Sequence, residues 1–316
     1  MDGPETIGLN QTGAGATLHS AGPHFSVNSP NRPNNDSSSV MVGKTESLVE
    51  NKAELLSRNP RRIRQMFEDI APSYDFLNHF LSANRDRAWR RQTMRLAELR
   101  DGDRVLDVCT GTGDLAFEAA RHAEVEVLGT DFCPGMVRVA REKMQRREGL
   151  RGRARSVHFS VADTLRLPFA DSSFDIVTVG FGIRNVADLR TGLTEMRRVL
   201  RPGGRAFVLE FASSGRGPSM FRRLFDLYFH HVLPRLGRFF SSAEEPEKDD
   251  AYSYLPDSVA RFPSPPDLSR LLEDVGFENV KYRLRLLGVV AIHWGQRKDG
   301  TPAGSNSAEA LARRGE

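Results

Sequence analysis

The stretch VLDVCTGTGD, residues 105–114, joins an apolar, partly β-branched run to a turn that contains Gly111 and Gly113. Such a run, followed by a glycine turn and a helix-like segment, predicts a strand, a tight turn and a helix whose first backbone amides approach a ligand closely. A second acid, Asp131, ends the next apolar run, and a carboxylate at that place can hold a ribose. The spacing therefore predicts a nucleotide-type cofactor site.

The pattern departs from the fingerprint of dinucleotide-binding proteins. The position of the third glycine holds Ala116, and the residue after Gly113 is Asp114. Asp107, which leads the D-x-x-x-G-x-G pattern, and Asp114 would repel a phosphate and attract a ligand that carries ammonium and sulfonium groups. S-adenosylmethionine is such a ligand. A tight turn without a ligand is the alternative, and the spacing to Asp131 favours the cofactor.

Composition limits the domain organisation and the partners. With 316 residues, of which 39% are hydrophobic, the chain can form one large domain or two small ones. Residues 1–45 and 299–316 are poor in large apolar groups, so we expect two disordered tails around a single domain at 46–298. The 45 basic and 41 acidic residues nearly balance and form no basic block with interleaved aromatics, which argues against a nucleic-acid partner.

The two cysteines, Cys109 and Cys133, follow predicted strands and are typical of small buried thiols, so we assign them neither a disulfide nor a metal. No secretory signal and no long apolar run is visible in the sequence. We therefore expect a cytoplasmic protein without a metal site.

Strand-like and helix-like segments alternate after the glycine turn. We expect strands at 104–108, 125–130, 157–161, 174–179 and 205–211, and helices at 114–122, 134–147 and 188–200. This alternation predicts an α/β fold with a doubly wound, mostly parallel sheet that is covered on both faces. A ligand then lies beyond the carboxyl ends of the strands. Polar groups gather there, namely residues 107–113, Asp131, Asp163 with Thr164, residues 180–185, and Glu210.

Five motifs together resemble a known family: VLDVCTGTGDLA, GTDFCPGM, ADTLRLPF, VGFGIRN and RRVLRPGGRAFVLEF. They are similar to class I S-adenosylmethionine-dependent methyltransferases, and specifically to the UbiE/MenG quinone C-methyltransferases of menaquinone and ubiquinone biosynthesis. YDFLN at 74–78, YSYLP at 252–256 and GVVAIHWG at 288–295 support the narrower resemblance, which covers roughly 59–297. It implies a seven-stranded sheet with one antiparallel strand near the C-terminus, and segments 282–287 and 289–295 fit the final pair.

The resemblance also implies roles for individual residues around the cofactor. Gly111, Thr112 and Gly113 would contact its methionine end, and Asp107 leads this motif. Asp131 would accept hydrogen bonds from the ribose hydroxyls. Asp163 and Thr164 would flank the adenine, although a capping role in a loop explains Asp163 equally well. Gly180 would pass beneath the sulfonium.

The chain departs from the family pattern at several positions. Leu77 stands where Met is usual, Asp86 where His is usual, and Thr164 and Ala212 where Ala and Ser are usual. An acidic insert, residues 243–250, precedes YSYLP. The exchange at Asp86 matters most, because a proton-carrying role of that histidine cannot be transferred to this chain.

Methylating a ring carbon of a quinol requires an electron-rich ring, in-line approach to the methyl group and loss of a proton. A nearby base or positive field would activate the ring. The candidates are Tyr74, Asp75, Asn78, His79, Arg184, Asn185, Tyr252, Tyr254 and His293. We favour Arg184 as the stabiliser of the quinolate and Asn185 for orienting the ring, with Tyr74 or Asp75 closing the pocket. A surface ion pair is the alternative for Arg184, and a core position is the alternative for His293.

Two further segments extend this picture. Residues 59–100 would form a helical segment on the substrate side, and residues 218–262 a helical lid with a loop insert. Within the latter, residues 220–240 carry an apolar stripe at helical spacing, which predicts a cover over a substrate tunnel, a core helix or a shallow membrane contact. Peripheral membrane contact at the inner face and a homo-oligomer are therefore open hypotheses.

The leading interpretation is S-adenosylmethionine-dependent C-methylation of a polyprenylated quinol, in particular of demethylmenaquinol. Methylation of a benzoquinol of the ubiquinone pathway is the alternative within the same enzyme class. A non-catalytic, cofactor-binding scaffold in a quinone-synthesis assembly is the alternative from another class.

Overall fold

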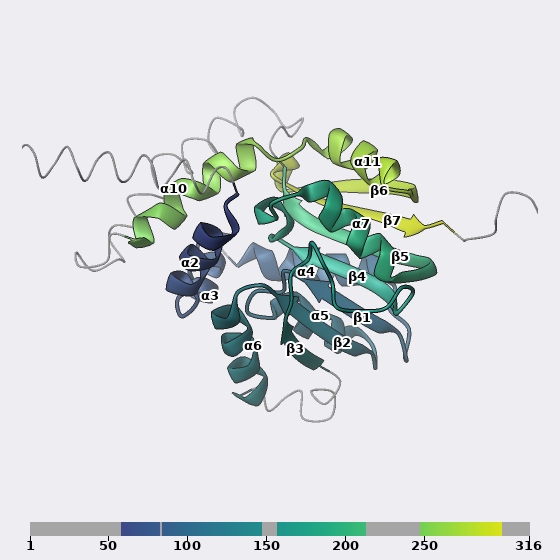
Figure 1. Ribbon diagram of the computed structural model, residues 1–316, viewed down its shortest axis with the longest axis horizontal. Helices are drawn as coiled ribbons and strands as arrows, with labels where there is room; N and C mark the ends of the chain where they lie inside the picture. Colours follow the sequence, from purple (N-terminus) through teal and green to yellow (C-terminus); the bar gives the residue numbers. More distant parts are fainter. Residues whose placement is uncertain (1–57, 83, 147–156, 213–246, 299–316) are drawn as a thin grey trace, which may run out of the picture. The chain divides into compact units, whose positions relative to one another are not determined.

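The computed structural model describes residues 58–82, 84–146, 157–212 and 247–298. Within these ranges the strands form one seven-stranded sheet in the order β3-β2-β1-β4-β5-β7-β6 (Figure 1). The strands are β1 (Arg104–Val108), β2 (Glu126–Asp131), β3 (Val157–Val161), β4 (Phe174–Gly180), β5 (Leu200–Phe211), β6 (Phe277–Arg285) and β7 (Val290–Arg297). The helices are α2 (Pro60–Ile70), α3 (Tyr74–Leu81), α4 (Arg85–Ala97), α5 (Asp114–His122), α6 (Pro134–Arg146), α7 (Leu189–Val199), α10 (Glu247–Ala260) and α11 (Pro265–Asp274), with 3-10 turns η3 (Ile183–Asn185) and η5 (Leu286–Gly288).

Strand direction follows the sequence prediction. Strands β1 to β5 pair with one another in parallel, and β7 runs antiparallel to both β5 and β6. The expected doubly wound, mostly parallel sheet with one antiparallel strand near the C-terminus is confirmed. Most boundaries agree to within a residue or two, but β5 and β6 each begin five residues before the expected position, at Leu200 and Phe277. Leu200 belongs to β5 because it pairs with Phe174 before the register shifts. Residues 201–204, which lie between the expected helix at 188–200 and the expected strand at 205–211, are therefore part of the strand.

Both faces of the sheet are covered by helices because neighbouring strand residues point to opposite sides. Leu106 and Val108 pack in one buried cluster with Leu193 of α7 and Leu268 of α11. Val105, which precedes Leu106 and points to the opposite face, packs in a second cluster with residues of α4, α5 and α6. The parallel strand ends are consequently held on a rigid, two-sided core, which fixes the position of any site above them.

Helix α2 lies at the carboxyl edge of the sheet, where it contacts residues far from it in the sequence. Pro60 occupies its first turn, and Asn59 caps it by accepting a hydrogen bond from the Arg61 amide at 3.0 Å. Glu68 accepts a hydrogen bond from the Gly135 amide at 3.0 Å, at the start of α6. Helix α2 also packs against α10 and α6, and Figure 1 shows α3 next to α2. These helices therefore form a wall next to the ends of β1 and β2.

Some predictions fall outside the described residues: the tails at 1–45 and 299–316, the apolar stripe at 220–240 and the lid before residue 247. Helices α2 to α4 lie within the segment 59–100 that was expected to be helical. In the described parts of the chain, no helix combines the length and the apolar character that crossing a bilayer requires.

Candidate active site

The turn after β1 depends on residues with left-handed backbone conformation. Gly111 and Gly113 have φ of 55° and 86°, and Cys109 also has a positive φ, of 49°. The Thr110 amide donates to the Thr130 carbonyl at 2.9 Å, which ties the turn to β2. The turn therefore delivers its backbone to the space above β1 and β2, and α5 begins immediately behind it.

Gly113 in the turn and Gly102, which precedes β1, allow a matched test of the turn. We expect Gly113→Ala to destabilise the protein more than Gly102→Ala, although both glycines have φ near +87°. A Cβ at Gly113 would lie 2.6 Å from the Phe159 ring, whereas a Cβ at Gly102 meets nothing within 4 Å. Backbone strain then costs about 1 kcal/mol in both variants, and overpacking adds roughly 1–2 kcal/mol at Gly113.

Urea denaturation of both variants measures this difference in the free energy of unfolding. Equal losses would show that the Phe159 ring yields without cost and that only the backbone angle matters.

Asp107 lies beneath the turn and is 1% exposed. Its two carboxylate oxygens accept hydrogen bonds from the hydroxyls of Thr110 and Thr178, each at 2.6 Å. Burial raises the pKa of Asp107 to about 6. Because both oxygens are engaged and the residue does not line the cavity, Asp107 braces the turn. That Asp107 attracts an ammonium group of the ligand stays a prediction.

Asp131 ends β2 and faces the cavity. One of its oxygens accepts a hydrogen bond from the Gly111 amide at 2.8 Å, and the other from the Cys133 amide at 3.0 Å. Burial nevertheless raises the pKa of Asp131 to about 6. The carboxylate is thus oriented by backbone groups, and its further lone pairs remain suited to hydroxyl donors of a ligand.

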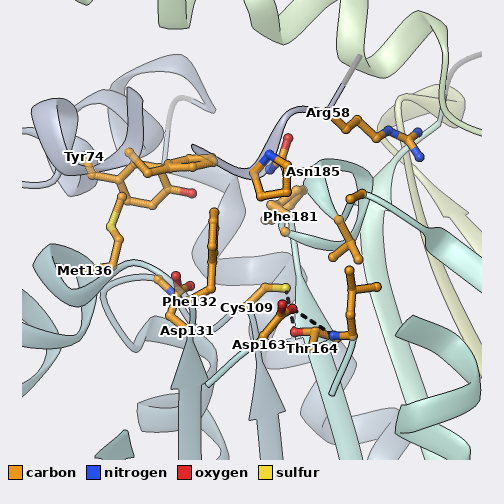
Figure 2. Close-up of a pocket in the computed structure, with 17 residues that line it drawn as sticks. Arg58, Tyr74, Cys109, Asp131, Phe132, Met136, Asp163, Thr164, Phe181 and Asn185 are labelled. Carbon is orange, nitrogen blue, oxygen red and sulfur yellow. Dashed lines mark hydrogen bonds between the residues drawn. The ribbon is translucent and has the colours of Figure 1, made fainter. Parts of the chain in front are cut away.

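A cavity lies above the ends of β1, β2 and β4, as Figure 2 shows. Its polar wall contains Gly111, Asp131, Asp163 and Thr164, and its apolar wall contains Phe67, Phe132, Met136 and Phe181. Tyr74 and Met136 stand on one side of the view, and Asn185 and Arg58 on the other. The arrangement provides one end for a polar, hydroxyl-bearing ligand and another for a flat apolar ring.

The structure brings together half of the residues proposed from the sequence. Tyr74, Gly111, Asp131, Asp163, Thr164 and Asn185 line the cavity. Asp75, Asp107, Thr112, Gly113, Gly180 and Arg184 are not among the described lining residues. Gly180 packs closely on α5, since a Cβ there would lie 3.1 Å from the Leu115 side chain. Asp163 accepts a hydrogen bond from the Leu165 amide at 2.9 Å, so its capping role is also present.

Arg184 is buried and forms an ion pair with Glu210 at 2.9 Å. The same guanidinium nitrogen donates to the Phe181 carbonyl, and the group lies over the Phe211 ring at 5.7 Å. Burial raises the pKa of Glu210 even though Arg184 opposes the shift. Arg184 is therefore neither a surface residue nor a free cation facing the cavity.

Asn185 lines the cavity, and its side-chain oxygen accepts a hydrogen bond from the Tyr254 hydroxyl at 3.0 Å. Tyr254, on α10, is 3% exposed, and burial raises its pKa, so the hydroxyl stays protonated. With its oxygen engaged, the amide presents its N–H groups as the donors that can meet a ligand. The Tyr74 hydroxyl is also protonated, because burial raises its pKa.

The two histidine candidates have structural partners. His293 is 1% exposed, and its Nε2 lies 2.9 Å from the Pro265 carbonyl. Burial lowers its pKa to about 4, so it is neutral at pH 7. His79 lies 2.9 Å from the Asp86 carboxylate. Neither histidine lines the described cavity.

Sequence reasoning missed Lys143, whose ammonium lies 2.6 Å from Asp75 and 2.7 Å from Asp114. Asp114 also lies 3.7 Å from Arg90, which pairs with Asp86. The oxygens of Asp86 and Asp114 and the nitrogens of His79 are close enough to hold a metal ion, but Arg90 already supplies the positive charge there. No pattern in the sequence indicates that a lysine on α6 meets an acid on α3.

The strand order, the cofactor turn after β1 and the acid at the end of β2 define the class of S-adenosylmethionine-dependent methyltransferases with a class I fold. A solved S-adenosylmethionine-dependent methyltransferase from Thermotoga maritima, described as a possible histamine N-methyltransferase, shares this fold. Its TM-score is 0.50 at 21% identity, and the match covers 74% of this chain and 99% of the other.

The chain belongs to the ubiE/COQ5 methyltransferase family, whose model matches residues 56–297. It is 44% identical to the ubiquinone/menaquinone biosynthesis C-methyltransferase UbiE of Geobacter sulfurreducens, over 77% of this chain and 91% of that protein. It is 46% identical to the demethylmenaquinone methyltransferase of Thermus thermophilus, over 73% of this chain and 100% of that protein. The family that the sequence motifs resemble is thereby confirmed.

Proposed function

We propose that this methyltransferase transfers the methyl group of S-adenosylmethionine to a ring carbon of a polyprenylated quinol, and that the quinol is demethylmenaquinol. The observation that carries the proposal is the cavity that is lined both by the Asp131 carboxylate and by aromatic side chains, which include Phe132 and Phe181. The names of the two relatives above both refer to menaquinone or its demethylated precursor, which favours a naphthoquinol over a benzoquinol.

The residues present fit S-adenosylmethionine. Asp131 is held by two backbone amides with lone pairs left for ribose hydroxyls. Asp163 and Thr164 follow β3, the strand next to β2, and line the cavity, where they would flank the adenine. Gly111 and Gly113 keep the turn free of side chains, and Thr112 and Asp107 hold it in place. When bound, the cofactor supplies an electrophilic methyl group.

The other residues would position the quinol. Phe67, Phe132 and Phe181 offer apolar surface that excludes water and packs on a flat ring. Asn185 would donate a hydrogen bond to a ring oxygen and so stabilise the quinolate character of the ring. We propose that Arg184 acts indirectly, because its contacts with Glu210 and the Phe181 carbonyl fix the backbone that carries Asn185.

Tyr74 and Asp75 would close the cavity from α3. Because a polyprenylated quinol resides in lipid, we propose that the enzyme takes it up during peripheral contact with the membrane.

The test uses the purified full-length protein with methyl-labelled S-adenosylmethionine and a short-chain demethylmenaquinol. We expect saturable transfer of label to the naphthoquinol, little transfer to the benzoquinol analogue, and none to the oxidised quinone, whose ring is electron-poor. Saturable cofactor binding without transfer to any quinol would instead support the non-catalytic scaffold. Faster transfer to the benzoquinol would assign the enzyme to the ubiquinone pathway.

A further inference from the structure

The ammonium group of Lys143 is fully engaged. It lies 2.6 Å from Asp75, 2.7 Å from Asp114 and 3.1 Å from the Thr112 hydroxyl. An ammonium carries three N–H donors, so each donor has an acceptor. Its side chain is only 17% exposed, which strengthens these contacts relative to those of a surface lysine.

The three acceptors come from different parts of the fold. Asp75 belongs to α3 and Thr112 to the cofactor turn, and Asp114 is the first residue of α5. Thr112 donates a further hydrogen bond to Asp75, which doubles the link between α3 and the turn. Asp75 also follows Tyr74, a residue of the cavity wall. One cation on α6 thus joins the substrate-side helix to the cofactor turn.

The charges explain why a cation is needed at this point. Burial favours the protonated form of Asp114, but Arg90 and Lys143 outweigh it and lower the pKa of this carboxyl to about 2. Asp114 is therefore ionised at neutral pH. Without Lys143, Asp75 would lose the cation that links it to Asp114, and the repulsion between the two carboxylates would push α3 away from the turn.

We propose that Lys143 is a positioning residue that holds α3 against the cofactor turn. Through Asp75 it keeps Tyr74 in the cavity wall, so that the cofactor and the quinol meet a preformed site. If its loss leaves about a tenth of the molecules with α3 docked, the apparent Kd rises about tenfold. The effect on the quinol rests on the proposed function, whereas the effect on α3 and on the cofactor does not.

The experiment compares Lys143→Met with Arg146→Met, a matched control on the same helix. Arg146 is 80% exposed and forms an ion pair, at 3.6 Å, with Glu142 of the same helix. Hydrogen exchange should become faster in residues 74–81 of Lys143→Met and stay unchanged in β1 and β4. The cofactor Kd should rise about tenfold, and the KM for the quinol should rise while kcat at saturation changes less than about twofold. Lys143→Arg should restore most of the affinity, and Arg146→Met should match the wild type.

A double-mutant comparison tests the route through Asp75. In an Asp75→Asn background, Lys143→Met should raise the Kd by much less than in the wild type, because the link is already lost. Two results would overturn the proposal. In the first, exchange in residues 74–81 and the cofactor Kd of Lys143→Met equal those of Arg146→Met. In the second, exchange becomes faster throughout the sheet, which would indicate a general structural role. Since exchange and cofactor titration need no quinol, failure of the methylation assay leaves this test valid.

Discussion

Asp131→Ala is expected to weaken the binding of S-adenosylmethionine by about 1.5–3 kcal/mol, or roughly 10- to 150-fold, because charge-assisted hydrogen bonds to the ribose are lost. Asp131→Asn should lose less, since an amide oxygen can still accept from the Gly111 or Cys133 amide. Calorimetric titration of the cofactor measures both losses. Asp274→Ala, which removes a surface acid that is 60% exposed, is the control and should bind as the wild type does. Unchanged affinity in Asp131→Ala would remove the ribose role.

The same carboxyl predicts a pH dependence. Burial raises the pKa of Asp131 to about 6, so the ionised form that can accept two hydroxyl donors prevails at pH 7 and above. Cofactor affinity should therefore be constant above about pH 7 and fall as the pH drops through 6, approaching about tenfold per pH unit. Asp107 titrates in the same range but does not line the cavity. Titrations between pH 5 and 8 should thus show the dependence in the wild type and its loss in Asp131→Asn.

Asp131 was predictable because its environment is largely local. A strand, the acid that ends it and a preceding glycine turn occupy a short sequence window, and parallel pairing then fixes their distance. The strands and helices of the sheet were predictable for the same reason, since their apolar periodicity is read within each segment. Even Asp107 was correctly placed at the end of β1.

What the sequence did not reveal are the partners of charged and polar groups. The hydroxyls of Thr110 and Thr178 engage Asp107, and Thr178 lies on another strand. With these partners, Asp107 holds the turn in place. Lys143 was missed because its acceptors come from three segments that only the fold brings together. Burial and pairing are long-range properties, so residue type and spacing alone do not determine which charges face a cavity.

Arg184 shows the consequence most clearly. The sequence places it in a glycine-flanked loop at a strand end, which favours a role toward the quinolate. In the structure, Glu210 of the neighbouring strand β5 is 1% exposed and takes up its charge at 2.9 Å. Arg184→Met is therefore expected to lower the free energy of unfolding by about 3–5 kcal/mol, because a buried carboxylate loses its counter-charge. The matched control is Arg190→Met, whose exposed pair with Asp274 contributes about 0–1 kcal/mol.

Two measurements separate this pairing from a direct role of Arg184 toward the quinol. The double variant Arg184→Met, Glu210→Gln should recover most of the lost stability, because no buried charge is left unpaired. In the single variant, burial without Arg184 should raise the pKa of Glu210 further, so the folded state binds a proton that the unfolded state has released. Its stability should then fall as the pH rises above the ordinary titration range of a glutamate carboxyl. If the single variant keeps full stability and a denaturation midpoint that is independent of pH but loses turnover, Arg184 acts directly on the quinolate.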